Sequence, residues 1–326
     1  MQTLWLDALL VVLGFVLLAR GAGGLVDGGA TLARRSGVSP LAVGLTIVAW
    51  GTSLPEVVVS SLAASEGRPG SSLGNVLGSN VANIALVLGA SAFVLPRVLQ
   101  GHERPREILW LLGSLGVLWV VCSDAAIDRA EALTLLGAFA IYNVLLWIAA
   151  RREARAFRAE VVEEVQSHAT RRPWTFVILG SVAVAAGAKL VVMGAAEIAS
   201  AVGMPDRVVG LTIFAFGTSL PELAAGLTSA WKGHHEIGYG NVIGSNVFNA
   251  LAVTGIAALV APFTGGAAQA EIGASLSRDF PPCAVFTGVL VVLPLLFRGR
   301  AGRWPGGLLV TAYLSWIGWL LVDLLP

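Results

Sequence analysis

The sequence predicts an all-α integral membrane protein with ten transmembrane helices, arranged as two inverted repeats of five helices each. Three observations lead to this fold class. Hydrophobic residues make up 56% of the 326 residues, and charged residues only 13%. Apolar segments long enough to cross a bilayer follow one another along almost the whole chain. Two polar motifs of the first half return in the second half at a constant distance.

The composition excludes several classes of protein. Disordered chains are polar and rich in charge, and an ordinary soluble domain has about 25% charged residues, so neither description fits this chain. The formal net charge of +1 gives no basic signal for nucleic acid. Cys122 and Cys283 lie in or beside apolar segments, and their spacing is typical of neither a metal finger nor a disulfide framework. We therefore expect both cysteines to be packing residues.

The ten predicted spans are justified in order by their length, because a spanning helix needs about 20 apolar residues. They are residues 4–33, 40–64, 72–95, 107–123, 132–150, 174–200, 206–230, 238–262, 281–297 and 306–325. The first segment lacks a preceding basic region and a convincing cleavage site, so we expect a membrane helix and not a signal peptide. The polar stretch 151–172 separates a first five-helix repeat, 1–150, from a second, 173–326.

Basic residues are distributed unevenly over the predicted loops. With the N-terminus placed outside, the inside loops hold most of the Lys and Arg residues. The outside loops hold only Arg68, Arg129, Arg207 and Arg278. Cytoplasmic loops carry an excess of Lys and Arg, so we expect both termini to be extracytoplasmic and the linker 151–172 to be cytoplasmic.

Two motifs recur at the same distance of 166 positions. GLTIVAWGTSLPE ends at Glu56 and GLTIFAFGTSLPE at Glu222, while GNVLGSNVAN ends at Asn83 and GNVIGSNVFN at Asn249. Each half holds five predicted spans, an odd number, so the two halves enter the membrane from opposite sides. Inverted repeats of this kind are typical of secondary transporters with a site near the bilayer midplane. A duplication kept only for helix packing would not require a glutamate in each copy.

The first motif combines a carboxylate with hydroxyl groups. A charged side chain in the bilayer core is costly and marks a functional site by default, which makes Glu56 and Glu222 the main candidates. Thr52 and Ser53 precede Glu56 by four and three positions, so their oxygens share one helix face with the carboxylate. The second copy repeats this spacing with Thr218 and Ser219.

The prolines of the first motif predict broken helices. Pro55 and Pro221 lack the N–H that would bond the carbonyl four residues earlier, which frees the carbonyls of Gly51 and Gly217. Non-helical backbone at membrane depth is tolerated where it is buried in protein or lines a cavity. We therefore expect freed backbone oxygens beside the hydroxyls and the carboxylates.

The second motif adds further oxygens. Ser79 and Asn83 are four positions apart, as are Ser245 and Asn249, so each pair lies on one helix face. The combined set is almost entirely hard oxygen, without Cys or His, and this disfavours soft metals. Ca²⁺ takes 6–8 oxygen ligands, and two glutamates would neutralise it, while the neutral oxygens could form Na⁺ sites. One pocket that binds either ion in turn would be an antiporter, with no cofactor.

At these motifs the sequence resembles the cation/Ca²⁺ exchanger superfamily and, within it, the prokaryotic Na⁺/Ca²⁺ exchangers. The resemblance rests on the two GTSLPE motifs, the two GNxxGSN motifs and their spacing, and the ten-span layout extends it over the whole chain. It implies Na⁺-driven Ca²⁺ export by alternating access across a prokaryotic plasma (inner) membrane. The ion site would be formed by spans two, three, seven and eight, and we expect a monomer in the bilayer.

The resemblance also implies the ligands. The glutamate of each first motif coordinates Ca²⁺ in the family, which points to Glu56 and Glu222. The other implied cation-binding groups are the side chains of Thr52, Ser53, Ser79, Thr218, Ser219 and Ser245 and the carbonyls of Ala49 and Ala215. The central asparagine of the family matches Asn83.

One position departs from the family pattern. The archetypal exchangers resemble this chain but carry Asp at the position of Asn249, so the ion ratio and the proton sensitivity stay open. The H⁺/Ca²⁺ branch carries Glu where this chain has Gly78 and Gly244, which disfavours that branch.

Rival functions remain open from the residues alone. The same fold could couple H⁺, K⁺ or another divalent ion. An intramembrane hydrolase could use Glu56 and Glu222 as an acid and base pair, although the motif has no nucleophile–base pair such as Ser–His. A channel is a further alternative, but inverted halves with broken helices favour alternating access.

Overall fold

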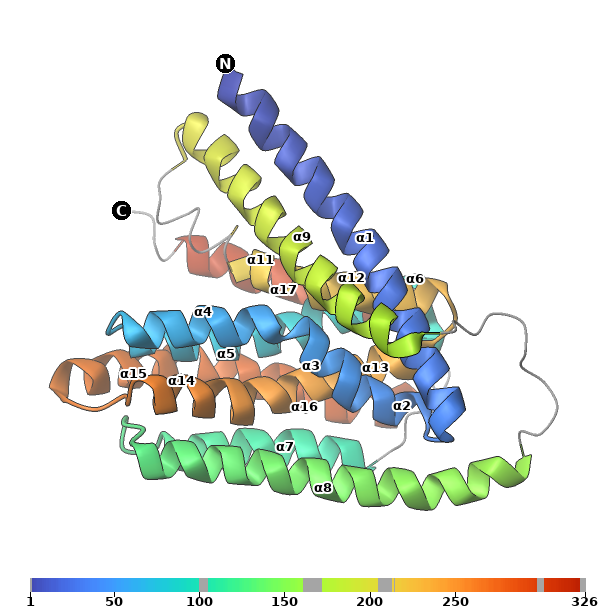
Figure 1. Ribbon diagram of the computed structural model, residues 1–326. Helices are drawn as coiled ribbons and strands as arrows, with labels where there is room; N and C mark the ends of the chain where they lie inside the picture. Colours follow the sequence, from blue (N-terminus) through green and yellow to red (C-terminus); the bar gives the residue numbers. More distant parts are fainter. Residues whose placement is uncertain are drawn as a thin grey trace.

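The computed structural model describes residues 2–99, 105–160, 172–204, 213, 215–297 and 302–322, and their fold is helical (Figure 1). The helices include seven that are long and apolar enough to cross a membrane, or eight if one bent pair counts as a single span. They are Leu4–Ser36, Pro69–Val94, Arg129–Arg152, Pro173–Ala201, His235–Val260, Gly266–Leu293 and Trp304–Val322, and the bent pair is Pro40–Thr52 with Leu54–Ser65. The predicted all-α membrane fold is thus confirmed at this level.

Two of the ten predicted spans fall outside this set. The segment predicted at 107–123 is helix α7 (Pro105–Val121), which is 17 residues long and just misses the required length. The segment predicted at 206–230 is described from residue 215 onward as α11 (Ala215–Thr218) and α12 (Leu220–Trp231), together with residue 213. The described helices therefore support seven or eight spans.

Helices α1 (Gln2–Ser36) and α9 (Pro173–Ala201) form a closely packed pair that is inclined to the rest of the molecule (Figure 1). Glycines line their contact at seven-residue intervals, at Gly14, Gly21 and Gly28 in α1 and Gly180, Gly187 and Gly194 in α9. A Cβ atom on Gly14 would lie 2.7 Å from the Gly187 carbonyl oxygen, and one on Gly21 2.9 Å from the Gly180 oxygen. Glycine is required because the two backbones touch.

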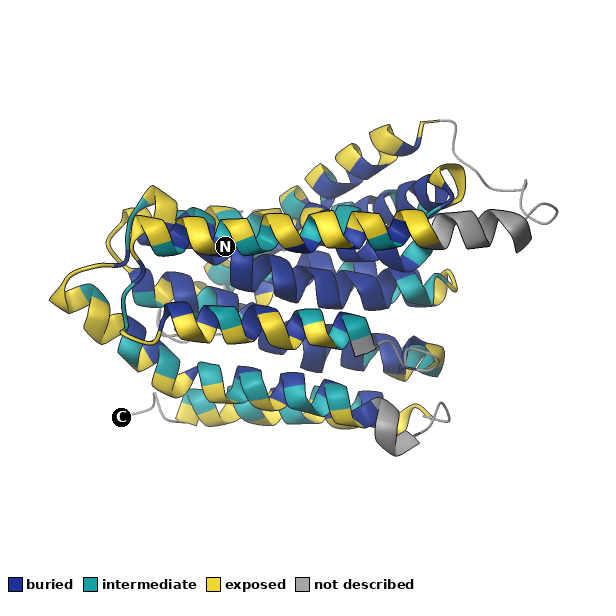
Figure 2. Cartoon of the chain, turned by 90° about the horizontal axis from the view of Figure 1, so that it is seen from below, coloured by how far each residue is buried: buried dark blue, intermediate teal, exposed yellow. Residues whose placement is uncertain are grey.

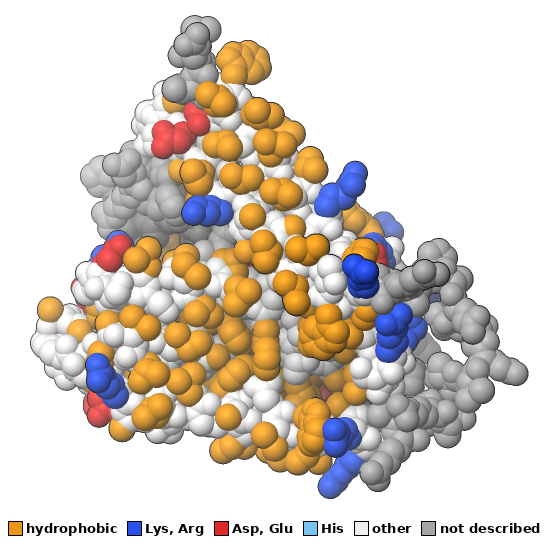
Figure 3. All heavy atoms as spheres, in the orientation of Figure 1, with side chains coloured by type: hydrophobic (Ala, Val, Ile, Leu, Met, Phe, Trp, Pro, Cys, Tyr) orange, Lys and Arg blue, Asp and Glu red, His pale blue; other side chains and the backbone are white. Residues whose placement is uncertain are grey.

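The two most buried spans form the centre of the molecule. One consists of α5 (Pro69–Ala82), the π-helical segment η2 (Asn83–Leu88) and α6 (Gly89–Val94). The other consists of α13 (His235–Val247), η5 (Phe248–Val253) and α14 (Thr254–Val260). Their most apolar windows are 83% and 89% buried, against 22% for α8 (Arg129–Glu160) and α17 (Trp304–Val322), as Figure 2 shows by colour. The outer helices present apolar side chains outward, as expected of a lipid-facing surface (Figure 3).

The backbone repeats the same irregularities 166 positions apart. Positive φ angles occur at Gly37 and Gly203, and again at Gly67 and Gly233. The chain turns to an extended conformation at Leu95 (φ −132°) and Ala261 (φ −140°), where α6 and α14 end. The sequence repeat is therefore also a repeat of local structure.

Two predicted connections contain helix. The stretch predicted as a linker from residue 151 begins as a continuation of α8, which ends at Glu160, while residues 161–171 lie outside the described residues. The loop predicted between 262 and 281 holds α15 (Gly266–Arg278), followed after Asp279 by α16 (Phe280–Phe297). Alanine, glutamine and glutamate at residues 267–271 are good helix formers, which explains α15.

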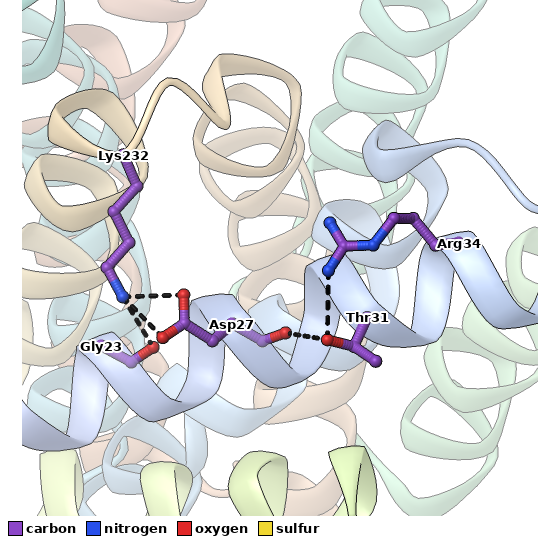
Figure 4. Close-up of polar contacts among 5 residues, drawn as sticks. All are labelled: Gly23, Asp27, Thr31, Arg34 and Lys232. Atoms are coloured by element: carbon purple, nitrogen blue, oxygen red, sulfur yellow. Dashed lines mark hydrogen bonds and ion pairs between the residues drawn. The ribbon is translucent and has the colours of Figure 1, made fainter. Parts of the chain in front are cut away.

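An ion pair ties α1 to the end of α12 (Figure 4). Lys232, directly after α12, donates from Nζ to both carboxylate oxygens of Asp27 at 2.7 Å. On the next turns of α1, Thr31 Oγ1 donates to the Asp27 carbonyl at 2.8 Å, and Arg34 donates to Thr31 Oγ1 at 3.3 Å. This end of the molecule carries a concentration of basic side chains (Figure 3).

Candidate functional site

In both copies of the first motif, the helix is broken at the serine two residues before the proline. The first copy follows α2 (Pro40–Val43) and the π-helical segment η1 (Gly44–Val48), and runs from α3 (Ala49–Thr52) into α4 (Leu54–Ser65) with a bend of 47°. Ser53 at the break has φ −89° and ψ 12°, and Ser219, between α11 and α12, has φ −86° and ψ 0°. Each proline takes the second position of the following helix, where its missing N–H is tolerated.

The breaks place side chains of one half against the other. Ser53 Oγ donates a hydrogen bond of 2.7 Å to Glu222 Oε1, so α3–α4 is bonded directly to α12. Thr52 Oγ1 lies 3.1 Å from Asn241 Oδ1 on α13 and 3.2 Å from each of the carbonyl oxygens of Val48 and Ala49. A hydroxyl has one proton to donate, so this threonine lies among more acceptors than it can satisfy.

The second motif joins the halves by asparagine side chains. Asn83 Nδ2 donates to Asn246 Oδ1 at 3.0 Å, and Asn80 Nδ2 donates to the Asn246 carbonyl at 3.3 Å. Asn83 is the first residue of the π-helical segment η2, and Asn249 lies within η5. Such π turns are frequent at functional sites, and here they occur next to the second motif in both halves.

The carboxylates lie deep in the protein. Glu56 and Glu222 are both 0% exposed. Glu222 has one hydrogen bond, from Ser53, whereas neither carboxylate oxygen of Glu56 has a hydrogen-bond partner among the described residues. Burying an unpaired carboxylate is expensive, so one such carboxylate from each half calls for a compensating positive charge.

Further oxygens of the two repeated motifs are buried without a hydrogen-bond partner in the described part of the chain. They are Glu222 Oε2, the hydroxyls of Ser79, Ser219 and Ser245, and the amide oxygens of Asn83 and Asn249. Most buried polar atoms in proteins are hydrogen-bonded, so buried oxygens without a partner are suited to binding a desolvated cation.

The predicted site residues fall into three groups. The structure places nine of them at buried positions: Thr52, Ser53, Glu56, Ser79, Asn83, Ser219, Glu222, Ser245 and Asn249. The carbonyl of Ala49 lies beside them, although it also accepts the N–H of Ser53 at 3.0 Å. Thr218 is half-buried at the end of α11, and Ala215 begins that helix next to residue 214, which lies outside the described residues.

Three asparagines of this centre are absent from the sequence-based set. They are Asn80, Asn241 and Asn246, all buried and all engaged in contacts between the two halves. The sequence contained the signal, because Asn80 and Asn246 are the last asparagines of the two copies of the GNxxGSN motif. Asn241 is the first asparagine of the second copy.

The helical membrane fold and the buried oxygens from both halves are those expected of a cation transporter. A family model described as sodium/calcium exchanger protein matches residues 6–148 and 172–322. The chain belongs to this sodium/calcium exchanger family.

Individual relatives cover nearly the whole chain. CaxA of Alkalimonas amylolytica is 38% identical over 313 residues, 94% of this chain and 96% of its own length. The sodium/calcium exchanger MaX1 of Methanosarcina acetivorans is 28% identical, with 95% and 97% covered. A solved structure of the sodium-calcium exchanger NCX_Mj superposes with a TM-score of 0.75 at 30% identity, covering 98% of this chain and 99% of that chain. The named exchangers are transporters and not enzymes, so the hydrolase alternative is dropped.

Proposed function

We propose that this protein exchanges Na⁺ for Ca²⁺ across a prokaryotic plasma (inner) membrane, by alternating access to the buried oxygen centre. The observation that carries the proposal is the pair of fully buried carboxylates, one from each half, with Ser53 of the first half bonded to Glu222 of the second. The names of MaX1 and NCX_Mj, both sodium/calcium exchangers, support the choice of ions.

In this proposal the ions bind to the side chains predicted from the sequence. Glu56 and Glu222 supply the negative charge for Ca²⁺, and hydroxyl and amide oxygens complete a shell of 6–8 ligands. The neutral ligands are Thr52, Ser53, Ser79, Asn83, Thr218, Ser219, Ser245 and Asn249, with the carbonyls of Ala49 and Ala215. Na⁺ would use subsets of the same oxygens, so the two ions compete and exclude one another.

The charge of the centre bears on the ion ratio. With asparagine at 249, the two obvious carboxylates are Glu56 and Glu222, and one Ca²⁺ or two Na⁺ would neutralise them. Three Na⁺ would leave an excess positive charge inside a low-dielectric site, which is costly. Exchange of two Na⁺ for one Ca²⁺, without net movement of charge, follows from this count.

The decisive experiment is Ca²⁺ uptake into proteoliposomes with one ion gradient imposed at a time. An outward Na⁺ gradient should drive Ca²⁺ inward, and K⁺ or H⁺ gradients of equal size should not. Uptake driven by the K⁺ or H⁺ gradient would mean that this ion, and not Na⁺, is the coupling ion. The assignment of the fold and of the ion site would be unaffected. Ca²⁺ movement that needs no counter-ion would mean a channel and would contradict exchange.

The proposal includes ten spans in two inverted units, 1–150 and 173–326, joined by the linker 151–172. The repeated backbone breaks support this arrangement, and the 17-residue α7 would then supply the fourth span. The basic end of the molecule would face the cytoplasm and both termini the outside. Cysteine labelling at Ser167→Cys, in a background lacking Cys122 and Cys283, tests the orientation: an impermeant reagent should label only opened cells.

A further inference from the structure

Asn246 of α13 holds the side-chain amide of Asn83 from across the boundary between the two halves. Asn83 Nδ2 donates a hydrogen bond of 3.0 Å to Asn246 Oδ1. The two side chains are only 1% and 0% exposed, so the bond lies in the protein interior, where a hydrogen bond is stronger than in water.

This bond decides which end of the Asn83 amide is left over. An asparagine side chain has an oxygen that accepts hydrogen bonds and a nitrogen that only donates them. Because Asn246 takes the nitrogen of Asn83, the remaining end is Oδ1, which is buried without a hydrogen-bond partner among the described residues. A cation is attracted by the oxygen and repelled by the NH₂ group, so only this orientation makes the amide a cation ligand.

The corresponding contact is missing at the matching position of the other half. In the repeat, Asn249 corresponds to Asn83, and Asn80 corresponds to Asn246. The mirrored bond would run from Asn249 Nδ2 to Asn80 Oδ1, but neither atom has a hydrogen-bond partner in the part of the chain that the structure describes. Asn80 instead donates from Nδ2 to the backbone carbonyl of Asn246 at 3.3 Å. The amide of Asn83 is therefore held, whereas that of Asn249 is not.

We propose that Asn246 is a positioning residue, which fixes the amide of Asn83 with its oxygen toward the transported Ca²⁺. The inference rests on the proposed function, in which Asn83 is an ion ligand, and it adds a residue that acts on the ion only through Asn83. Without the Asn246 oxygen, the Asn83 amide turns about its last side-chain bond and presents its NH₂ group for part of the time. Ca²⁺ binding is then weaker although every ligand atom is still present.

The test is a double-mutant cycle for Ca²⁺ binding to the full-length protein in detergent, measured by isothermal titration calorimetry. Asn246→Leu keeps the branched shape of the side chain but removes the acceptor, and Asn83→Ala removes the ligand. Each single variant should raise the Kd for Ca²⁺ about tenfold, as expected for the loss of one interaction with a charged group. The double variant should bind no more weakly than Asn83→Ala, because Asn246 then has no amide to hold.

The matched control is Asn80→Leu. It removes the other asparagine bond between α5 and α13 but leaves the bond between Asn83 and Asn246 in place, so it should change the Kd less than about twofold. In proteoliposomes, Asn246→Leu should raise the KM for Ca²⁺ and leave the maximal rate nearly unchanged. Thermal melting without Ca²⁺ reports folding, and Asn246→Ala takes the place of Asn246→Leu if the leucine does not fit.

The outcomes separate a positioning role from a structural one. Losses that multiply in the double variant, to about a hundredfold, would mean that Asn246 acts independently of Asn83, and they would overturn the proposal. An equal loss in Asn80→Leu would mean that the asparagines only join the halves, which would overturn it as well. Neither result contradicts exchange, since the wild type still binds Ca²⁺. A wild type that binds no Ca²⁺ would instead overturn the proposed function, and this role with it.

Discussion

Replacing one buried carboxylate by its amide tests the ion site most directly. Glu222→Gln keeps the shape of the side chain and an oxygen that can still accept the Ser53 hydrogen bond, so the fold should persist. The divalent ion then faces one carboxylate instead of two. Removing one partner of a buried charge pair costs about 3–5 kcal/mol, which corresponds to a loss of Ca²⁺ affinity of at least about a hundredfold and up to several thousandfold. Glu56→Gln should act in the same way.

The assay is thermal melting in detergent with and without Ca²⁺, followed by flux in proteoliposomes. At a Ca²⁺ concentration of about 100 times the wild-type Kd, binding stabilises the native state by about 2.7 kcal/mol. A variant with a hundredfold weaker site gains only about 0.4 kcal/mol at that concentration. The Ca²⁺-dependent rise in Tm should therefore nearly vanish, and Ca²⁺ transport should be abolished.

The control is Glu66→Gln, the same substitution just after the end of α4, where the side chain is 44% exposed and paired with Arg68. It should leave both the Tm shift and the flux unchanged. Near-normal Ca²⁺ stabilisation and flux in a well-folded Glu56→Gln or Glu222→Gln protein would refute the assignment of the carboxylates.

Four other single substitutions and one double variant test position 249 and the basic end of the molecule. Asn249→Asp adds a third carboxylate, which a third Na⁺ would neutralise. Exchange of three Na⁺ for one Ca²⁺ moves net charge, so transport by the variant should respond to a membrane potential set with valinomycin, whereas transport by the wild type should not. Asp27→Lys and Lys232→Asp should each lower Tm slightly, since exposed ion pairs contribute about 0–1 kcal/mol, and the double variant should recover it; additive losses would mean that the pair does not act as a unit. Burial lowers the pKa of the His234 side chain, and the nearby positive charge of Arg34 lowers it further. Lys232 and His235 act in the same direction, and the negative charge of Asp27 offsets part of the decrease. The folded protein resists protonation there and loses stability as pH falls below about 6.5, so His234→Gln should flatten the Tm profile in that range, and an unchanged profile would exclude this histidine.

The membrane class and the repeat could be read from the sequence because both depend on local patterns. Apolar length predicts a span without knowledge of its neighbours, and the proline in each GTSLPE copy predicts a helix break that the structure places at Ser53 and Ser219. Cys122 and Cys283 are buried free cysteines, in agreement with a packing role.

The details of the centre could not be predicted, because they depend on contacts between the halves. Two nearly identical motifs give no reason to expect that Ser53 bonds Glu222 while Glu56 has no such partner among the described residues. The π-helical turns at Asn83 and Asn249 shift the facing side chains by a fraction of a turn, which simple helical spacing does not anticipate. The contact between Thr52 and Asn241 likewise joins residues 189 positions apart.

The seven-residue spacing of glycines between α1 and α9 constrains the kinds of sequence change that this pair can accept. Each residue of a helix turns by about 100°, so an insertion or deletion of one residue between Gly14 and Gly28 would rotate every later position away from the contact. Side chains larger than glycine would then meet the backbone of α9, where a single Cβ on Gly28 would already lie 2.8 Å from the Pro173 carbonyl oxygen. Length changes in this stretch should therefore be tolerated only in steps of a whole heptad, although the lipid-facing side of α1 can vary freely in its apolar residues.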